Sequence, residues 1–281
     1  MSLPSQPRAV ITGGASGLGR TLCLQLAQRS ARILIADIHQ ERADATAGEV
    51  RAAGGTAQVF IGDVSDPKQV EAMINTAVQA WGGIDLLVNN AGVAGAGAVG
   101  EVSLEDWHWI VGINMWGVIH GCHYAVPIMR SQGSGHILNV ASSAGIANLP
   151  EMASYNVSKA AVISLSETLH TELMHHGIHV SALCPTFFPT NLLESFRSPD
   201  ERQRKFAETM FKRATMSCDT VATAALKGVE QNEPHIIPQK DGKLLWAVKR
   251  LSPSFYLRKV AKGYRAKVVD KRPSTTPSGT A

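Results

Sequence analysis

Short aliphatic runs alternate with longer stretches in which apolar residues recur at helical spacing. The aliphatic runs predict buried strands, and the stretches between them predict amphipathic helices. Strands are predicted at 8–12, 32–36, 57–61, 84–88, 136–140, 178–184 and 235–237. Helices are predicted at 17–29, 40–53, 67–81, 104–131, 153–176 and 219–231. Because such alternation builds a parallel sheet covered by helices on both faces, we expect one doubly wound α/β domain over residues 1–238.

The first predicted strand runs into a glycine-rich turn, Gly13-Gly-Ala-Ser-Gly17-Leu-Gly19. Glycine suits a sharp bend that approaches a diphosphate closely, and the following helix aims free N–H groups at the phosphates. Asp37 ends the second strand, where a carboxylate can accept both hydroxyls of an adenosine ribose and would repel a 2′-phosphate. The pattern therefore favours NAD. Two alternatives remain, since Asp37 can instead cap the next helix, and Arg20 and Arg42 are close enough in sequence to serve NADP.

Tyr155 and Lys159 are four residues apart on the predicted helix 153–176, and Ser142 precedes them. This spacing puts the phenol and the ammonium one turn apart on one helix face. A fixed cation beside a phenol favours the phenolate and lowers a pKa that is ordinarily about 10. A tyrosine and a lysine at this spacing are by themselves common on helices with one buried and one solvated residue. Together with the glycine turn, they predict a proton-transfer site beside a dinucleotide.

In combination these motifs resemble the short-chain dehydrogenase/reductase family. The resemblance rests on the glycine turn after Thr12, on the run Asn89-Asn90-Ala91-Gly92, and on the ordered set Ser142, Tyr155 and Lys159. It covers about residues 7–238 and implies a Rossmann-type fold and an NAD-dependent oxidoreductase.

The resemblance also implies a role for each catalytic residue. Tyr155 would be the proton donor or acceptor at the substrate oxygen, and Ser142 would hydrogen-bond the same oxygen. Lys159 would bind the nicotinamide ribose and lower the pKa of the tyrosine. Asn114 matches the fourth catalytic position, where it would anchor a water that links Lys159 to solvent.

Cofactor contacts follow from the same resemblance, with Asp63 and Val64 at the adenine and Thr190 at the carboxamide. The full set is Gly13, Ser16, Gly17, Leu18, Gly19, Asp37, Asp63, Val64, Asn90, Ala91, Gly92, Tyr155, Lys159, Pro185 and Thr190. The Asn89–Gly92 run is expected to serve partly as a structural turn. The chain departs from the family at Thr186, where many members have glycine after the proline. Since threonine resists positive φ, we expect a different path for this loop.

Substrate selection is expected in a lid over residues 186–217, which we predict to precede the next regular helix. Its apolar residues are Phe187, Phe188, Leu192, Leu193, Phe196, Met210 and Phe211. Ala144, Leu149, Met152 and the loop 94–96 would extend the lining. Because these residues offer no partner for a charged group, they favour a hydrophobic secondary alcohol or ketone as substrate.

The composition places few further limits on function. The chain has 281 residues, of which 44% are hydrophobic, enough for one large core. No apolar stretch approaches the ~18 residues of a membrane span, and the first seven residues do not resemble a signal peptide. The four cysteines are scattered without metal or redox spacing, so we expect reduced core residues, no metal site and a cytoplasmic location.

The C-terminal extension, residues 239–272, is strongly basic. Residues 240–272 contain eleven lysines and arginines against two aspartates, a net charge of +9 in a chain of +4. Pro253 and Gly263 should interrupt a long amphipathic helix, which favours a segment that covers its own domain or a subunit neighbour. Weak peripheral membrane contact through 240–272 is the second interpretation, and nothing favours nucleic acid. Residues 273–281, rich in Ser, Thr, Pro and Gly, are predicted to be disordered.

Taken together, these features favour an NAD(H)-dependent oxidoreductase that interconverts a hydrophobic alcohol and its ketone. An NADP(H)-dependent carbonyl reductase is the alternative within the enzymes, and a non-catalytic NAD-binding sensor or scaffold is the alternative outside them. The family likeness implies a homodimer or homotetramer built on the helices 104–131 and 153–176.

Overall fold

Seven parallel strands form one sheet in the computed structural model, which describes residues 3–266. The strands are β1 (Arg8–Thr12), β2 (Arg32–Asp37), β3 (Thr56–Ile61), β4 (Leu86–Asn89), β5 (Gly135–Val140), β6 (Ile178–Leu183) and β7 (His235–Ile236). Their order is β3-β2-β1-β4-β5-β6-β7, so the winding reverses between β1 and β4. Such a reversal leaves a crevice at the carboxyl ends of the strands. The doubly wound, Rossmann-type α/β prediction is confirmed.

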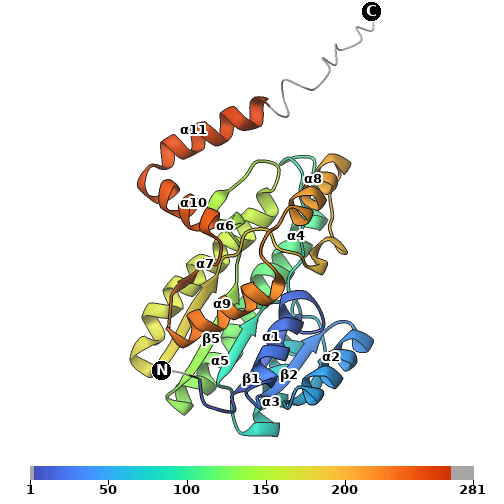
Figure 1. Ribbon diagram of the computed structural model, residues 1–281, viewed down its shortest axis with the longest axis vertical. Helices are drawn as coiled ribbons and strands as arrows, with labels where there is room; N and C mark the ends of the chain where they lie inside the picture. Colours follow the sequence, from blue (N-terminus) through green and yellow to red (C-terminus); the bar gives the residue numbers. More distant parts are fainter. Residues whose placement is uncertain (1–2, 267–281) are drawn as a thin grey trace, which may run out of the picture.

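Helices cover both faces of the sheet, and each face has its own hydrophobic core (Figure 1). One face carries α1 (Gly17–Ala27), α2 (Gln40–Ala52) and α9 (Cys218–Glu230). The other carries α3 (Pro67–Trp81), α5 (Gly117–Gln132) and α7 (Ala153–Leu173). Leu22, Val50 and Val229 are fully buried on the first side, as are Ala77, Met129 and Val162 on the second. Burial of a large aliphatic side chain stabilises the fold by about 1.5–3 kcal/mol, so these two clusters hold the sheet rigid beneath the crevice.

The predicted helix 104–131 is interrupted. It consists of α4 (Leu104–Val111), a π-helical turn η1 (Gly112–Trp116) and then α5. Periodicity alone does not distinguish the wider π turn from an α-helix, and such turns often mark functional sites. The predicted helix 153–176 ends earlier than expected, because α7 gives way to a 3₁₀ turn, η2 (Met174–His176).

The lid segment contains a regular helix that the sequence analysis missed, α8 (Glu201–Lys212). Asp200 caps it by accepting a hydrogen bond from the backbone N–H of Arg202. The helix is strongly charged and Ala207 is its one buried residue, so its pattern resembles a solvated loop. Two short elements were also missed, α6 (Ala144–Ala147) and the 3₁₀ turn η3 (Asn191–Leu193).

The C-terminal extension forms two helices that pack on the domain, α10 (Lys240–Leu251) and α11 (Pro253–Tyr264). Pro253 occupies the first turn of α11, where its missing N–H costs nothing. The expected break at Gly263 is wrong, since this glycine lies within the last turn of α11. The Tyr256 hydroxyl is buried and donates to the Ala147 carbonyl at 2.9 Å. Residues 267–272 of the extension and the tail predicted at 273–281 lie outside the described residues.

Three of the four cysteines, Cys23, Cys122 and Cys184, are buried as expected. Cys218, at the start of α9, is only half-buried and packs against the edge of the core. Across residues 3–266, the helices are too short or too polar to cross a bilayer.

Candidate active site

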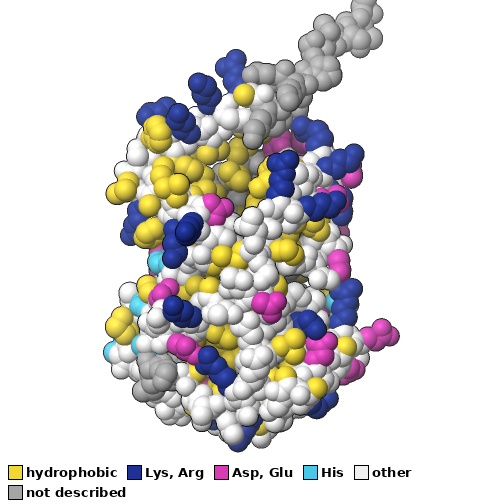
Figure 2. Space-filling model, viewed as in Figure 1, with side chains coloured by type: hydrophobic (Ala, Val, Ile, Leu, Met, Phe, Trp, Pro, Cys, Tyr) yellow, Lys and Arg dark blue, Asp and Glu magenta, His cyan; other side chains and the backbone are white. Residues whose placement is uncertain are grey.

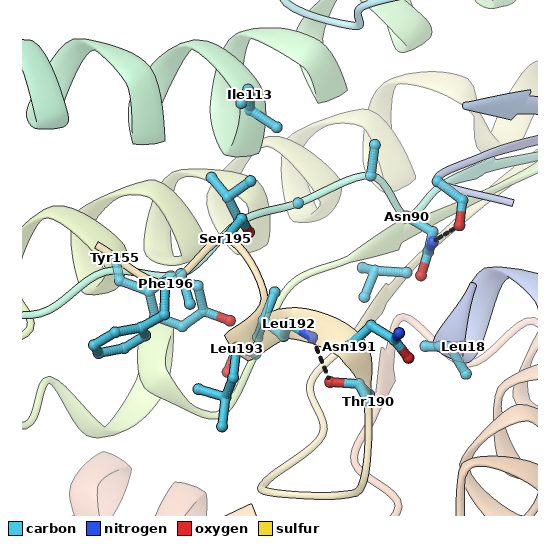
Figure 3. Close-up of a pocket in the computed structure, with 18 of the residues that line it drawn as sticks. Leu18, Asn90, Ile113, Tyr155, Thr190, Asn191, Leu192, Leu193, Ser195 and Phe196 are labelled. Atoms are coloured by element: carbon cyan, nitrogen blue, oxygen red, sulfur yellow. Dashed lines mark hydrogen bonds between the residues drawn. The ribbon is translucent and has the colours of Figure 1, made fainter. Parts of the chain in front are cut away.

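A cavity of about 820 Å³ opens at the carboxyl ends of the strands and collects most of the predicted site residues. Those that line it are Gly13, Ser16, Gly17, Leu18, Asp37, Asp63, Val64, Asn90, Ala91, Gly92, Ser142, Tyr155, Lys159, Pro185 and Thr190. Gly19 and Asn114 are the two predicted site residues that do not line the cavity. In the close-up, Leu18 and Asn90 lie toward one end, Tyr155 and Phe196 toward the other, and the turn from Thr190 to Leu193 between them (Figure 3).

The glycine turn is too tight for side chains. Gly13 has φ +62, and a Cβ there would lie 2.9 Å from the Cα of Ala91. A Cβ on Gly19 would lie 2.1 Å from the Gly13 carbonyl oxygen, so this glycine lets α1 pack against the turn. The Asn90 amide donates to the carbonyls of Thr12 and Gly13 at 2.9 and 3.0 Å and braces the turn from β4. Because no side chain caps the N-terminus of α1, its first N–H groups fit a dinucleotide diphosphate.

Asp37 lies at the end of β2, on the cavity wall. One carboxylate oxygen accepts the backbone N–H of Ala15 at 3.0 Å, and the other accepts that of His39 at 3.1 Å. The carboxylate therefore ties the glycine turn to β2 while it lines the cavity. His39, not Asp37, holds the N-cap position of α2, so the helix-cap interpretation of Asp37 is wrong.

Arg20 and Arg42, the two arginines that the NADP alternative depends on, are both paired with carboxylates. Arg20 forms an ion pair with Glu49 on α2, away from the cavity lining. Arg42 does line the cavity, where it meets Glu194 of the lid at 2.8 Å. This pair was not foreseen, because its partners are 152 residues apart in the chain. The hydrogen bond from Arg42 lowers the pKa of Glu194, which keeps the lid carboxylate ionised.

Helix α7 presents Tyr155 and Lys159 to the cavity from adjacent turns. Their exposed fractions are only 8% and 4%. The Lys159 ammonium donates to the Val140 carbonyl at 2.9 Å, at the end of β5, and lies 5.8 Å from the centroid of the tyrosine ring. Ser142 follows the same strand, and its hydroxyl oxygen accepts the backbone N–H of Ala144 at 3.1 Å. Strand β5 and helix α7 thus bring the three side chains to one place.

Burial dominates the electrostatics of this group. It raises the pKa of Tyr155 to about 12, and a hydrogen bond with Ser142 acts in the opposite direction. The same burial lowers the pKa of Lys159 to about 8. The tyrosine pKa is therefore raised, which is opposite to the net depression that was expected. A phenolate at this position loses more by leaving water than it gains from the hydrogen bond with Ser142.

Asn114 is fully buried in the π-helical turn, and its side chain hydrogen-bonds the backbone of Val93. Its side-chain oxygen accepts the N–H of Val93 at 2.8 Å, and its amide donates to the Val93 carbonyl at 2.9 Å. The amide also reaches the Ser158 hydroxyl at 3.3 Å. A Cβ on Gly92 would lie 3.2 Å from the Asn114 oxygen and 3.5 Å from the Lys159 nitrogen, so both side chains lie close to Gly92.

The end of the cavity near Tyr155 is apolar. Tyr155 belongs to a small cluster with Ala94, Ala96, Phe196 and Ala207, packed against Ala144, Met152, Leu192 and Leu193. Leu149, Phe187, Phe188 and Phe211 line the same cavity as predicted, whereas Met210, Gly95 and Ala96 do not reach the lining. Trp109 of α4 also lines it and was missed, because its helix resembled ordinary packing.

The lid is attached to the domain by further contacts. Arg197 stacks over the Trp109 ring at 3.9 Å and pairs with Asp106 at 3.0 Å. Thr186 begins the lid without positive φ, so no backbone strain follows from the missing glycine. Its N–H donates to the Gln239 side chain at 3.0 Å, which anchors the start of the lid to the segment before α10. Among residues 3–266, there is no group of three or more His, Cys, Asp or Glu side chains suited to a metal ion.

Comparison with known proteins gives a consistent picture. A family model described as short chain dehydrogenase matches residues 7–201. A cyclohexanol dehydrogenase from Acinetobacter sp. is 31% identical over 193 residues, which span 68% of this chain and 77% of its own. The crystal structure of a short chain dehydrogenase/reductase from Burkholderia phymatum in complex with NAD is 31% identical, with a TM-score of 0.79 and 97% of each chain covered. An oxidoreductase from Mycobacterium tuberculosis is 31% identical over 252 residues, 86% of this chain, but this chain spans only 43% of its length.

Proposed function

Because the chain belongs to the short-chain dehydrogenase/reductase family, we propose that it is an NAD(H)-dependent oxidoreductase for a hydrophobic secondary alcohol and its ketone. The single observation that carries the proposal is the group of Ser142, Tyr155 and Lys159 in the wall of a cavity that also contains the glycine turn and Asp37. Proton transfer and dinucleotide binding thereby share one continuous space.

Ser142, Tyr155 and Lys159 have different roles in the proposed reaction. When bound, a nicotinamide supplies or accepts the hydride at the substrate carbon. Ser142 hydrogen-bonds the substrate oxygen and stabilises its developing charge, and Tyr155 gives that oxygen a proton in reduction or removes it in oxidation. With its pKa raised to about 12, the phenol is protonated at neutral pH and ready to act as the acid. Lys159, when protonated, stabilises the phenolate that results.

The choice of NAD rests on Asp37 and on the pairing of Arg42. A 2′-phosphate beside the Asp37 carboxylate would be repelled, and Arg42, the cation on that wall, is already paired with Glu194. The relative from Burkholderia phymatum was solved with NAD. An NADP(H)-dependent carbonyl reductase is the second candidate, because Arg42 lines the cavity and could exchange Glu194 for a phosphate. Fluorescence titration with NADH and NADPH separates the two, and tighter binding of NADPH would favour the second candidate.

The apolar cluster around Tyr155 supports a hydrophobic substrate. Phe196, Leu192 and Met152 offer no charged or hydrogen-bonding group, so a substrate gains there mainly by leaving water. The similarity to a cyclohexanol dehydrogenase agrees with a secondary alcohol of moderate size. A panel of cyclic and linear secondary alcohols, followed as NADH formation, tests the substrate class.

Replacing Tyr155 with Phe tests the catalytic assignment. The variant keeps the ring and its packing but has no proton to transfer, so turnover should fall by about 10²–10⁴-fold. The Kd for NADH, measured by fluorescence, should stay close to that of the parent. Turnover that persists near the parent level would refute the role of Tyr155, and loss of NADH binding would point instead to a damaged cavity.

We also propose a homo-oligomer through the helices that the family likeness implicates. Trp116, between α4 and α5, and Val157 on α7 are about half exposed, at 49% and 51%. Large apolar side chains at such positions gain free energy when a second copy covers them. Light scattering on the eluted protein would report a dimer or tetramer, and a Trp116→Ser variant should shift it toward the monomer.

A further inference from the structure

The C-terminal hairpin, defined here as α10 and α11, concentrates the positive charge of the protein. Residues 240–264 contain seven lysines and arginines and a single acidic residue, Asp241, for a net charge of +6. The whole chain carries +4, so the remaining residues carry −2. The hairpin is therefore a cationic surface on a slightly acidic body.

An exposed apolar stripe runs along α10. Leu244 and Leu251 are 65% and 86% exposed, and Ala247 lies between them on the same helix face. Lys240 lies on the same face, with Lys243 at its edge, and both are exposed. In the space-filling view, hydrophobic side chains gather over α10 and α11, with lysines and arginines along the edge (Figure 2).

Helix α11 continues this mixture of apolar and cationic groups. Phe255 is 45% exposed, and the Lys259 ammonium lies 5.5 Å from the centroid of its ring. Arg258 and Lys262 are exposed on adjacent turns, and Leu257 is 51% exposed. The solvent-exposed side of the hairpin thus combines apolar side chains with closely spaced lysines and arginines.

The hairpin is held by its opposite face, so the apolar stripe cannot turn inward. Tyr256 donates to the Ala147 carbonyl, and the Lys249 ammonium donates to that of Ile146. Both carbonyls belong to α6, whose Ala144 and Ala147 line the cavity. The hairpin therefore lies next to the wall of the apolar end of the cavity.

We propose that the C-terminal hairpin docks the protein on the surface of an anionic lipid bilayer. Leu244, Leu251 and Phe255 would enter the boundary between headgroups and acyl chains, while the lysines and arginines meet the lipid phosphates. A second copy of the chain is the weaker occupant, because an isologous contact would bring two +6 surfaces together. Docking puts the apolar cavity beside the phase in which hydrophobic alcohols accumulate.

Vesicle co-sedimentation of the full chain tests the proposal. The protein should bind vesicles of phosphatidylglycerol mixed with phosphatidylcholine and stay in solution with phosphatidylcholine alone. Binding should weaken by at least about tenfold in high salt, because the lipid charge is then screened. Failure of the full chain to co-sediment with the anionic vesicles at low salt would overturn the proposal.

Two double variants separate the apolar and the cationic contributions. Leu244→Ser with Leu251→Ser, and Lys240→Glu with Lys243→Glu, should each reduce the vesicle partition coefficient by about tenfold or more. Val99→Ser, at a position that is 75% exposed and lies outside both the hairpin and the helices 104–131, gives the matched apolar control, and Lys68→Glu with Lys227→Glu gives the charge control. Both controls should bind like the parent, and thermal melting verifies that every variant is folded.

Light scattering on the same variants addresses a second copy as occupant. Unchanged vesicle binding by the Leu244→Ser, Leu251→Ser variant would overturn the proposal. The proposal would also be overturned if the parent formed an oligomer that this variant loses, and neither protein bound vesicles. The apolar stripe would then be a contact between subunits.

Discussion

Gly145 is the point at which α6 rests on the catalytic helix α7, and substitution by alanine tests how closely the site depends on that contact. An ideal Cβ at Gly145 would lie 2.6 Å from the Lys159 carbonyl carbon, 2.7 Å from the Ala160 nitrogen and 2.8 Å from the Lys159 oxygen. Ordinary contact begins at 3.4 Å. These neighbours are backbone atoms of a buried helix and cannot rotate away, so α6 must move by roughly 0.8 Å.

Such a movement reaches the reacting groups directly. Ser142 lies three residues before Gly145 and is bonded to the first residue of α6, while Tyr155 stays with α7. Misplacement by about 1 Å can cost on the order of 10²-fold in rate, or about 2.7 kcal/mol on the barrier. The glycine turn and Asp37 lie on other elements. We therefore expect kcat to fall by about 10²-fold, with the Kd for NADH close to that of the parent.

The assay is steady-state turnover of an accepted alcohol, together with NADH fluorescence titration and urea unfolding. Overpacking should also lower the free energy of unfolding by about 1–3 kcal/mol. Gly48→Ala is the matched control, because a Cβ on that residue of α2 meets nothing within 4 Å. It should leave kcat unchanged and add about 0.5–1 kcal/mol of stability. A Gly145→Ala enzyme with the kcat of the parent would refute the reasoning.

Two further predictions concern charge. Glu194→Gln releases Arg42 from its ion pair, so NADPH should bind about 3–10-fold more tightly while NADH binding stays constant. Fluorescence titration with both cofactors measures the change, and an unchanged NADPH affinity would mean that Arg42 does not reach the ribose. Burial lowers the pKa of Lys159 from 10.5 to about 8, so the buried lysine costs stability below pH 8, and this cost disappears as pH rises to 10.5. In urea unfolding, the parent should therefore gain about 3 kcal/mol relative to Lys159→Met over that pH window, and a difference independent of pH would contradict the assigned burial effect.

The fold and the order of the motifs follow from local properties of the sequence. Aliphatic runs predict strands because a strand buried on both faces must be apolar throughout, and the helices show themselves by their period. The glycine turn was recognisable for a similar reason, since Gly13 adopts a conformation that other residues avoid. The spacing of Tyr155 and Lys159 depends only on helical geometry, which a short stretch of sequence contains in full.

Other features depend on contacts between distant segments. The charged pattern of α8 concealed a helix that forms beside the cavity, and a π turn, invisible to periodicity, brings the Asn114 amide to Val93. The lid pairs Glu194 with Arg42 across 152 residues of chain. None of these contacts has a local signature, because each requires two surfaces that meet only after folding.

The protonation of Tyr155 and Lys159 shows most clearly which properties are local and which depend on the folded structure. Sequence by itself determined that a phenol and an ammonium lie one turn apart beside a dinucleotide turn, because helical geometry and the need for glycine act over a few residues. It also suggested that the cation would lower the tyrosine pKa, and here only the tertiary structure decided. Burial of Tyr155 and Lys159 disfavours both charges, because desolvation depends on every element packed around the pair.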